Sequence, residues 1–134
     1  DKERLENDAN INETLTVLKD ALSNCTTDAE VLGMLLGLEI PAIENIETIY
    51  QSLAHTEELR ASLAQSKFFS LHRQIEVEHV RLTVANFLRF CTTPGDKTDF
   101  IKGFESGLEF WQTFWNAVST RITAEKTRGV SHAS

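Results

Sequence analysis

The chain has 134 residues, of which 20 are acidic and 13 are basic, so its formal net charge is −7. Hydrophobic residues make up 41% of it, a balance that suits one folded domain and excludes disorder as the overall state. An acidic chain without a basic run predicts no nucleic-acid partner. No apolar segment reaches the ~18–20 residues that span a bilayer, so we expect no membrane association. The two cysteines, Cys25 and Cys91, are too few for a disulfide framework and indicate a reducing, cytoplasmic location.

Helix signals dominate along the chain, and strand signals are almost absent. We predict an all-α bundle with helices at about 3–23, 28–54, 56–65, 67–91 and 97–124, followed by a frayed polar tail at about 125–134. Thr27 and Glu30 form a plausible capping box before the second helix, and Pro41 should bend or break that helix. We therefore predict that residues 1–134 form a single helical domain. Because the chain starts at Asp1 and its only methionine is Met34, we expect it to be the C-terminal part of a longer bundle.

The last long helix carries an aromatic face that we assign to the core. Gly103 and Gly107 lie on the same face, where they would let a neighbouring helix approach closely. The apolar members of this face are Phe100, Phe104, Trp111, Phe114, Trp115, Val118 and Ile122.

The helix at about 67–91 places polar groups on its apolar face. His72, Glu76 and His79 project from one stripe within about 40° of His72, and Phe69 and Phe87 lie on that stripe too. Burying two imidazoles and a carboxylate without partners costs several kcal/mol. Neutral imidazole and carboxylate are suitable ligands for iron, manganese or zinc, so the pattern predicts a metal site.

Glu39 is a second polar residue on an apolar stripe, at the centre of the face that carries Leu32, Ile43 and Tyr50. It is the carboxylate of its helix most suited to point inward and meet the histidine helix. We therefore predict Glu39, His72, Glu76 and His79 as metal ligands. The alternative is that His72 and His79 are core histidines hydrogen-bonded to Glu39 and Glu76.

With these residues in view, the sequence resembles the heme-oxygenase-like dimetal oxidases. It is most similar to the branch typified by the Chlamydia protein associating with death domains (CADD-like), and to related TenA-like helical proteins. The resemblance covers about residues 30–120 and rests on His72-x3-Glu76-x2-His79 preceded by Glu39, with support from Phe68 and Phe69 before the first histidine.

This resemblance implies a heme-oxygenase-like helical bundle that binds iron or manganese and activates dioxygen to oxidise an unknown small-molecule substrate. The same four residues would be metal ligands by position. Where the family motif often has Asp, this chain has Glu76, which is one methylene longer. Family members take a further Glu and usually a His from an earlier helix, yet residues 1–38 contain no histidine. Either that helix is missing from the chain or the dimetal site has been lost.

Three other interpretations stay open. A ferritin-like carboxylate bundle needs a Glu-x-x-His element on two helices, and the chain has it once, at Glu76 and His79. A non-catalytic CADD-like or TenA-like bundle would act in protein–protein association, with a homodimer as the expected assembly. A TenA-like hydrolase would need a thiol in its pocket, and neither cysteine lies on the Glu39 or His72 stripe.

Overall fold

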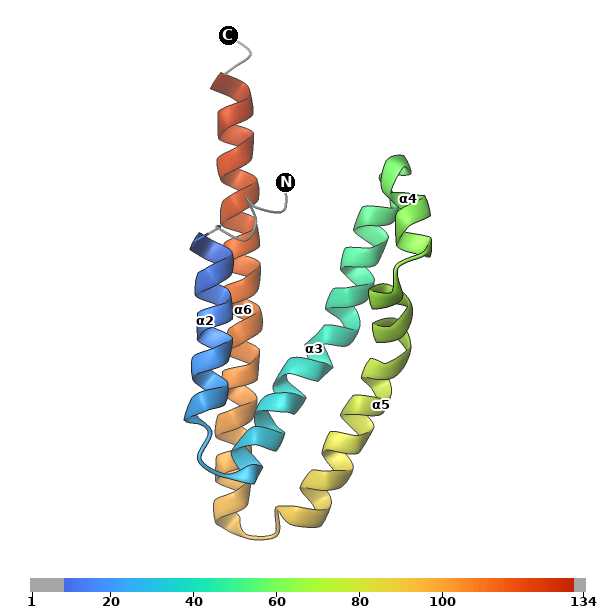
Figure 1. The fold of residues 1–134 in the computed structure, drawn as a ribbon. Coiled ribbons are helices and arrows are strands. Elements are labelled where there is room, and N and C mark those ends of the chain that lie inside the picture. Colours follow the sequence, from blue (N-terminus) through green and yellow to red (C-terminus); the bar gives the residue numbers. More distant parts are fainter. Residues whose placement is uncertain (1–8, 132–134) are drawn as a thin grey trace.

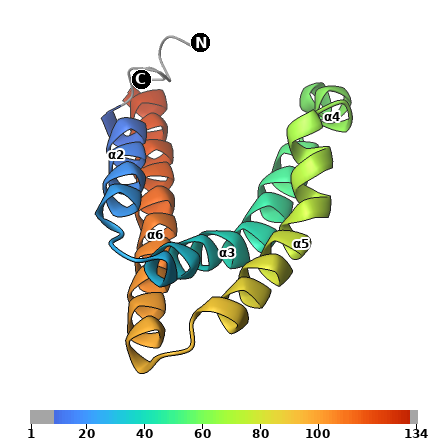
Figure 2. The same ribbon diagram turned by 60° about the horizontal axis from the view of Figure 1, so that its bottom comes forward.

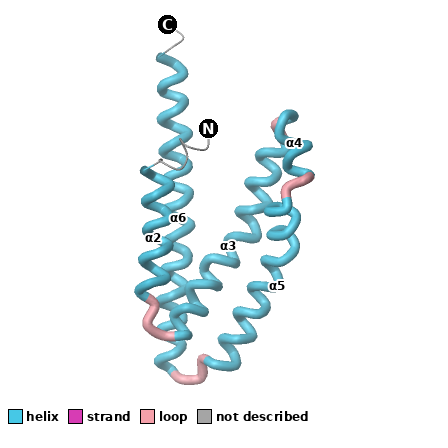
Figure 3. The backbone as a smooth tube through the Cα atoms, in the orientation of Figure 1, coloured by secondary structure: helices cyan, strands magenta, loops and turns pink. Residues whose placement is uncertain are grey.

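The computed structural model describes the backbone of residues 9–131 and the side chains of residues 12–124. In that part of the chain every regular element is a helix (Figure 3). The elements are α2 (Ala9–Asn24), α3 (Asp28–Ala54), α4 (Glu57–Ala64), α5 (Lys67–Phe90) and α6 (Pro94–Ser131). The prediction of an all-α bundle is confirmed.

The helices form two arms that open away from each other (Figures 1 and 2). In one arm α2 lies beside α6. In the other, α3 leads outward to the short helix α4, and α5 returns antiparallel along α3 (Figure 1). The arms join where α3 crosses α6, so the core sits at this crossing and α5 lies at the edge of the molecule.

The crossing of α3 and α6 depends on glycine. A Cβ atom built on Gly103 would lie 1.9 Å from the carbonyl oxygen of Glu30, and one on Gly33 would lie 1.9 Å from that of Phe100. Gly37 and Gly107 are also crowded by the opposite backbone, where a Cβ atom would lie 2.3 Å and 2.6 Å from the nearest carbonyl oxygen. Met34, between them, is completely buried. The close approach that the sequence predicted at Gly103 and Gly107 is therefore confirmed.

Beyond these glycines, the aromatic face of α6 packs against α3. The indole N–H of Trp111 donates to the carbonyl oxygen of Leu38 over 2.9 Å, and that of Trp115 donates to Oδ1 of Asn45 over 3.2 Å. Each tryptophan thus places its ring against α3 and satisfies its one polar atom. This supports the core assignment for the two tryptophans, which are half-buried against α3. The assignment is wrong for Ile122, farther along the same face, which is 52% exposed.

The helix ends follow local chemistry, but several of them depart from the prediction. Thr27 caps α3 by accepting from the backbone N–H of Glu30, as expected, but the Glu30 carboxylate accepts from the backbone N–H of Thr26 instead of Thr27. Pro41 does not break α3. The last helix begins at Pro94 and not at about residue 97, because proline is well suited to a first helical position. It continues to Ser131, so residues 125–131, expected to belong to a frayed tail, are helical. Over the described residues, no helix is both long and apolar enough to cross a membrane.

Candidate metal-binding site

Glu76 is the buried centre of the predicted site. It lies on the face of α5 that packs against α3, with 7% of its surface exposed. Its Oε2 atom lies 3.6 Å from Nδ1 of His79, one turn later on the same helix. The His79 side chain is still 41% exposed. The structure therefore places the two residues side by side on one face of α5, but it leaves the imidazole at the border of the contact with α3.

His72 lies one turn before Glu76 and is held by its own helix. Its Nδ1 lies 2.9 Å from the carbonyl oxygen of Phe68, and its ring stacks on the Phe68 ring with centroids 4.2 Å apart. An Nδ1–H that donates to a backbone carbonyl leaves Nε2 as the free nitrogen, which is how a metal-binding histidine is usually oriented. The expectation that His72 and His79 are buried is not met, because α3 covers one side of α5 and both rings lie beside that contact.

Glu39 reaches α5, but at a different point from Glu76. Its Oε2 accepts a hydrogen bond of 2.9 Å from the hydroxyl of Thr83. Thr83 is buried and lies two turns beyond Glu76 on the same face of α5. Glu39 thus points toward the histidine helix as predicted, and its partner there is a hydroxyl that the sequence analysis did not single out.

A small hollow opens beside these residues between α3 and α5. Its volume is about 170 Å³, and His72 and Glu76 line it together with Ile43, Glu47, Arg73 and Val77. Arg73 donates to Glu47 through Nε over 2.6 Å, and its guanidinium lies 4.2 Å from the Tyr50 ring centroid. Hydrogen bonds from Gln51 and then Arg73 lower the pKa of Glu47. One wall of the hollow is therefore an ion pair already satisfied by protein.

This ion pair was not predicted, because Arg73 and Glu47 are not among the polar residues singled out on the two apolar stripes. The spacing between Glu39 and Glu47 could have indicated that Glu47 also faces α5. Glu47 lies eight residues after Glu39, which is little more than two turns, so both carboxylates can face one neighbouring helix.

The four predicted ligands do not converge on a single site within the described part of the chain. Among the residues that the structure describes, no three His, Cys, Asp or Glu side chains lie close enough together to hold a metal ion. Glu76 and His79 form a pair, Glu39 is engaged by Thr83, and His72 is turned toward Phe68. The chain as folded supplies parts of a ligand set and does not by itself fit a bound iron or manganese ion.

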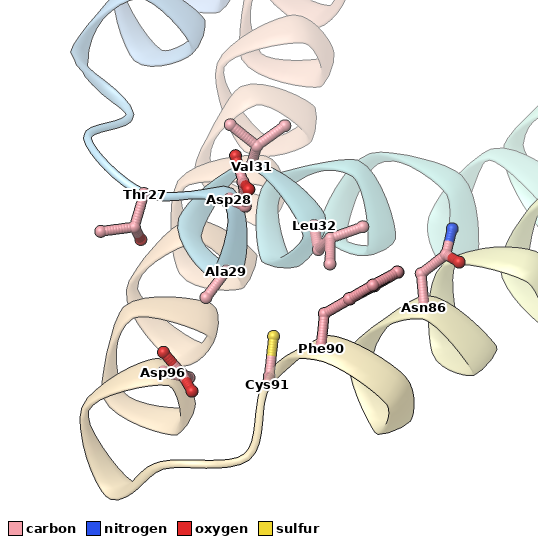
Figure 4. Close-up of a pocket in the computed structure, with 9 residues that line it drawn as sticks. All are labelled: Thr27, Asp28, Ala29, Val31, Leu32, Asn86, Phe90, Cys91 and Asp96. Carbon is pink, nitrogen blue, oxygen red and sulfur yellow. The ribbon is translucent and has the colours of Figure 1, made fainter.

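A larger pocket lies at the other end of α5 and contains no histidine (Figure 4). It has a volume of about 600 Å³ between the start of α3, the end of α5 and the start of α6. Cys91 and Asp96 are among its lining residues. Burial, followed by the charges of Asp96 and Asp28, raises the pKa of the Cys91 thiol, which disfavours the nucleophilic thiolate. The pocket therefore offers no sign of cysteine chemistry.

The comparisons with known proteins agree with the fold. Residues 1–112 match the sequence pattern of a heme-oxygenase-like family described as iron-containing redox enzymes. No curated protein and no solved structure gives a significant match. The match spans most of the chain, including α3, α5 and all four predicted ligands. The chain belongs to this family of heme-oxygenase-like, iron-containing redox enzymes.

Proposed function

We infer that this chain acts as part of a metal-dependent oxidase or oxygenase that uses iron or manganese to activate dioxygen. The observation that carries the inference is the family match, read together with the buried Glu76 beside His79. Iron or manganese, when bound, would supply the redox chemistry toward dioxygen. Glu39, His72, Glu76 and His79 are the residues that we propose as ligands. The substrate is an unidentified small molecule.

The chain's own contribution would be to hold and orient its ligands. Burial of Glu76 favours an interaction with a cation, since a buried carboxylate needs a charged or hydrogen-bonding partner. The hydrogen bonds at His72 and Glu39 set the direction of an imidazole and a carboxylate. Because the ligands of one chain do not converge, the functional assembly must add ligands from outside the residues described.

Metal content tests this proposal directly. We would purify the chain without chelator, load it anaerobically with Fe(II) or Mn(II), and measure bound metal by elemental analysis. The His72→Ala, His79→Ala double variant should lose the metal while its circular dichroism stays that of the parent. His55→Ala is the matched control, because His55 is the C-cap of α3 and lies outside the site. Absence of metal from the loaded parent would defeat the proposal.

A second candidate is a non-catalytic helical bundle that acts in protein–protein association. It is favoured by the many large apolar side chains left exposed on α5, such as Leu82 and Leu88. This function predicts no metal uptake by the parent or by either histidine variant. The elemental analysis therefore separates the two candidates.

A further inference from the structure

A pocket of about 430 Å³ lies at the outer end of one arm of the molecule, where α3, α4 and α5 meet (Figure 1). Its volume is within the range of about 300–1,000 Å³ that is typical of small-molecule sites. Leu63, which is buried, and the ring of Tyr50 line its apolar side. Ser70, Arg73 and Gln74, all from α5, line its polar side. An apolar wall with a few polar groups is the usual composition of such a site.

Arg73 is held in place by its neighbours. Its Nε and Nη2 atoms donate to the two carboxylate oxygens of Glu47 over 2.6 Å and 3.2 Å. Its guanidinium carbon lies over the Tyr50 ring, 4.2 Å from the centroid, and Tyr50 in turn packs edge-on against Phe69. The ion pair and the ring contact thus hold the guanidinium on two sides. A group that is already oriented loses less conformational freedom when a ligand binds to it.

The ion pair leaves donors unused and few acceptors. Glu47 accepts twice from Arg73 and once from Nε2 of Gln51, over 2.7 Å, so three of its roughly four acceptor positions are filled. A guanidinium has five N–H groups, and Arg73 gives two of them to Glu47. Within the described part of the chain, its other N–H groups and the side chains of Ser70 and Gln74 have no protein partner. The pocket is therefore rich in free donors, which favours a ligand that carries acceptors.

A carboxylate is the acceptor that this arrangement fits best. Glu47 occupies the guanidinium edge formed by Nε and Nη2, so no described residue uses the edge formed by Nη1 and Nη2. That edge offers one N–H from each nitrogen, a spacing that matches the two oxygens of a carboxylate. Hydrogen bonds from Gln51 and then Arg73 lower the pKa of Glu47, so it stays ionised at neutral pH. Its negative charge disfavours a doubly charged phosphate more than a singly charged carboxylate.

We propose that this pocket binds a small organic carboxylate, with its two oxygens on the Nη1 and Nη2 atoms of Arg73. The organic part of the ligand lies against Tyr50 and Leu63, which form the apolar wall. The Ser70 hydroxyl and the Gln74 amide line the same space and supply donors for further polar atoms of the ligand.

The proposed site borders the candidate metal ligands. Glu47 and Arg73 also line the smaller hollow beside His72 and Glu76. A bound carboxylate would therefore lie next to these two residues. The site itself needs no metal ion, so it does not depend on the proposed metal-dependent function.

The single tyrosine provides a probe inside the pocket. Because Tyr50 is the only tyrosine of the chain, incorporation of meta-fluorotyrosine gives one fluorine NMR signal, from a ring that contacts Arg73. We would titrate the labelled full chain with benzoate in chelator-containing buffer. We expect a saturable shift of this signal with a millimolar or lower dissociation constant, in keeping with so small a ligand. Absence of a saturable shift with millimolar benzoate would overturn the site.

Matched arginine variants test the contact. Arg73→Gln removes the charge and the open edge, so the dissociation constant for benzoate should rise at least about tenfold. Arg81→Gln is the control, because Arg81 is also paired on α5, with Glu78, but does not line the pocket. It should bind benzoate as the parent does, and circular dichroism should show both variants folded. An equal effect of the two substitutions would overturn the contact.

Arg73→Lys keeps the test decisive if Arg73→Gln does not fold. Lysine retains the positive charge opposite Glu47 but lacks the planar fork of the guanidinium. We expect it to weaken benzoate binding as well. An unchanged dissociation constant in Arg73→Lys would contradict the two-oxygen contact.

Two further compounds test the class of ligand. Benzamide has the same ring without the charge and should bind at least about tenfold more weakly than benzoate. Inorganic phosphate should displace benzoate only at a higher concentration than benzoate itself requires. Equal binding of benzamide, or tighter binding of phosphate, would overturn the carboxylate assignment. Benzoate binding that depends on Arg73, in a parent that never takes up metal, supports the pocket and defeats only the metal-dependent function.

Discussion

The hydroxyl of Thr83 on α5 donates a hydrogen bond of 2.9 Å to the carboxylate of Glu39 on α3. Thr83 is buried, whereas Glu39 is partly exposed. This bond joins the two helices that carry all four predicted ligands, and it fixes the direction of one of them. A carboxylate oriented by a neighbouring donor is typical of metal-site carboxylates, which are themselves hydrogen-bonded.

Replacing Thr83 by Val should therefore lower stability. The substitution keeps the shape of the side chain but removes the donor, so the free energy of unfolding should fall by about 1 kcal/mol. Urea denaturation followed by circular dichroism measures the change. Glu39→Gln, which keeps an oxygen acceptor for the Thr83 hydroxyl, should cost less than Thr83→Val. If Thr83→Val leaves the free energy of unfolding unchanged, the hydrogen bond does not contribute to stability.

Adding a methyl group at Gly103 should disturb the crossing of α3 and α6. The new Cβ would lie 1.9 Å from the Glu30 carbonyl oxygen, a rigid backbone atom, so the helices must separate. We expect Gly103→Ala to cost about 1–3 kcal/mol, as in other overpacked cores. Gly95→Ala is the control, because a Cβ there meets only the Thr93 hydroxyl at 3.6 Å. Thermal unfolding should show a lower Tm for Gly103→Ala and no loss for Gly95→Ala.

Most of the fold could be predicted from local sequence pattern. Periodicity located each of the five described helices, and the capping residue Thr27 marked the start of α3. Gly103 and Gly107 on the aromatic face indicated a close crossing. Such features are encoded by neighbouring residues, which is why sequence alone suffices for them. The helix at 28–54 was predicted with a bend or break at Pro41, but α3 is not broken there, because one lost hydrogen bond matters less in a long, well-packed helix.

The candidate site could be predicted only in part. Helical periodicity correctly placed Glu76 on the buried face of α5 and Glu39 on the side of α3 that lies toward α5. It could not say how deeply His72 and His79 would be covered, because that depends on which other helices lie against α5. Periodicity identifies a face but not its neighbour. For the same reason, the hydrogen bond between Thr83 and Glu39 could not be predicted.

The thiol of Cys91 should react slowly while the chain is folded. Burial raises its pKa, and the nearby carboxylates of Asp96 and Asp28 raise it further. Because the thiolate is the reacting form, labelling by a disulfide reagent at pH 8 should be at least about tenfold slower than in urea. A Cys25→Ser variant confines the signal to Cys91. Equal rates in the folded and unfolded chain would contradict this prediction.

The ion pair between Glu30 and Lys102 should make stability depend on pH. Their side chains lie 2.6 Å apart, and hydrogen bonds from Lys102 and from the Thr26 backbone lower the pKa of Glu30. A lowered carboxyl pKa stabilises the fold above the ordinary glutamate value of about 4.3, and this contribution disappears as pH falls through the lowered value. The Tm of the parent should therefore exceed that of Glu30→Gln at pH 7, and the difference should shrink toward pH 3. Glu109→Gln is the control, because Glu109 is exposed. At pH 7 its Tm should differ less from that of the parent than the Tm of Glu30→Gln does. Equal Tm differences for the two variants would contradict a specific contribution of Glu30.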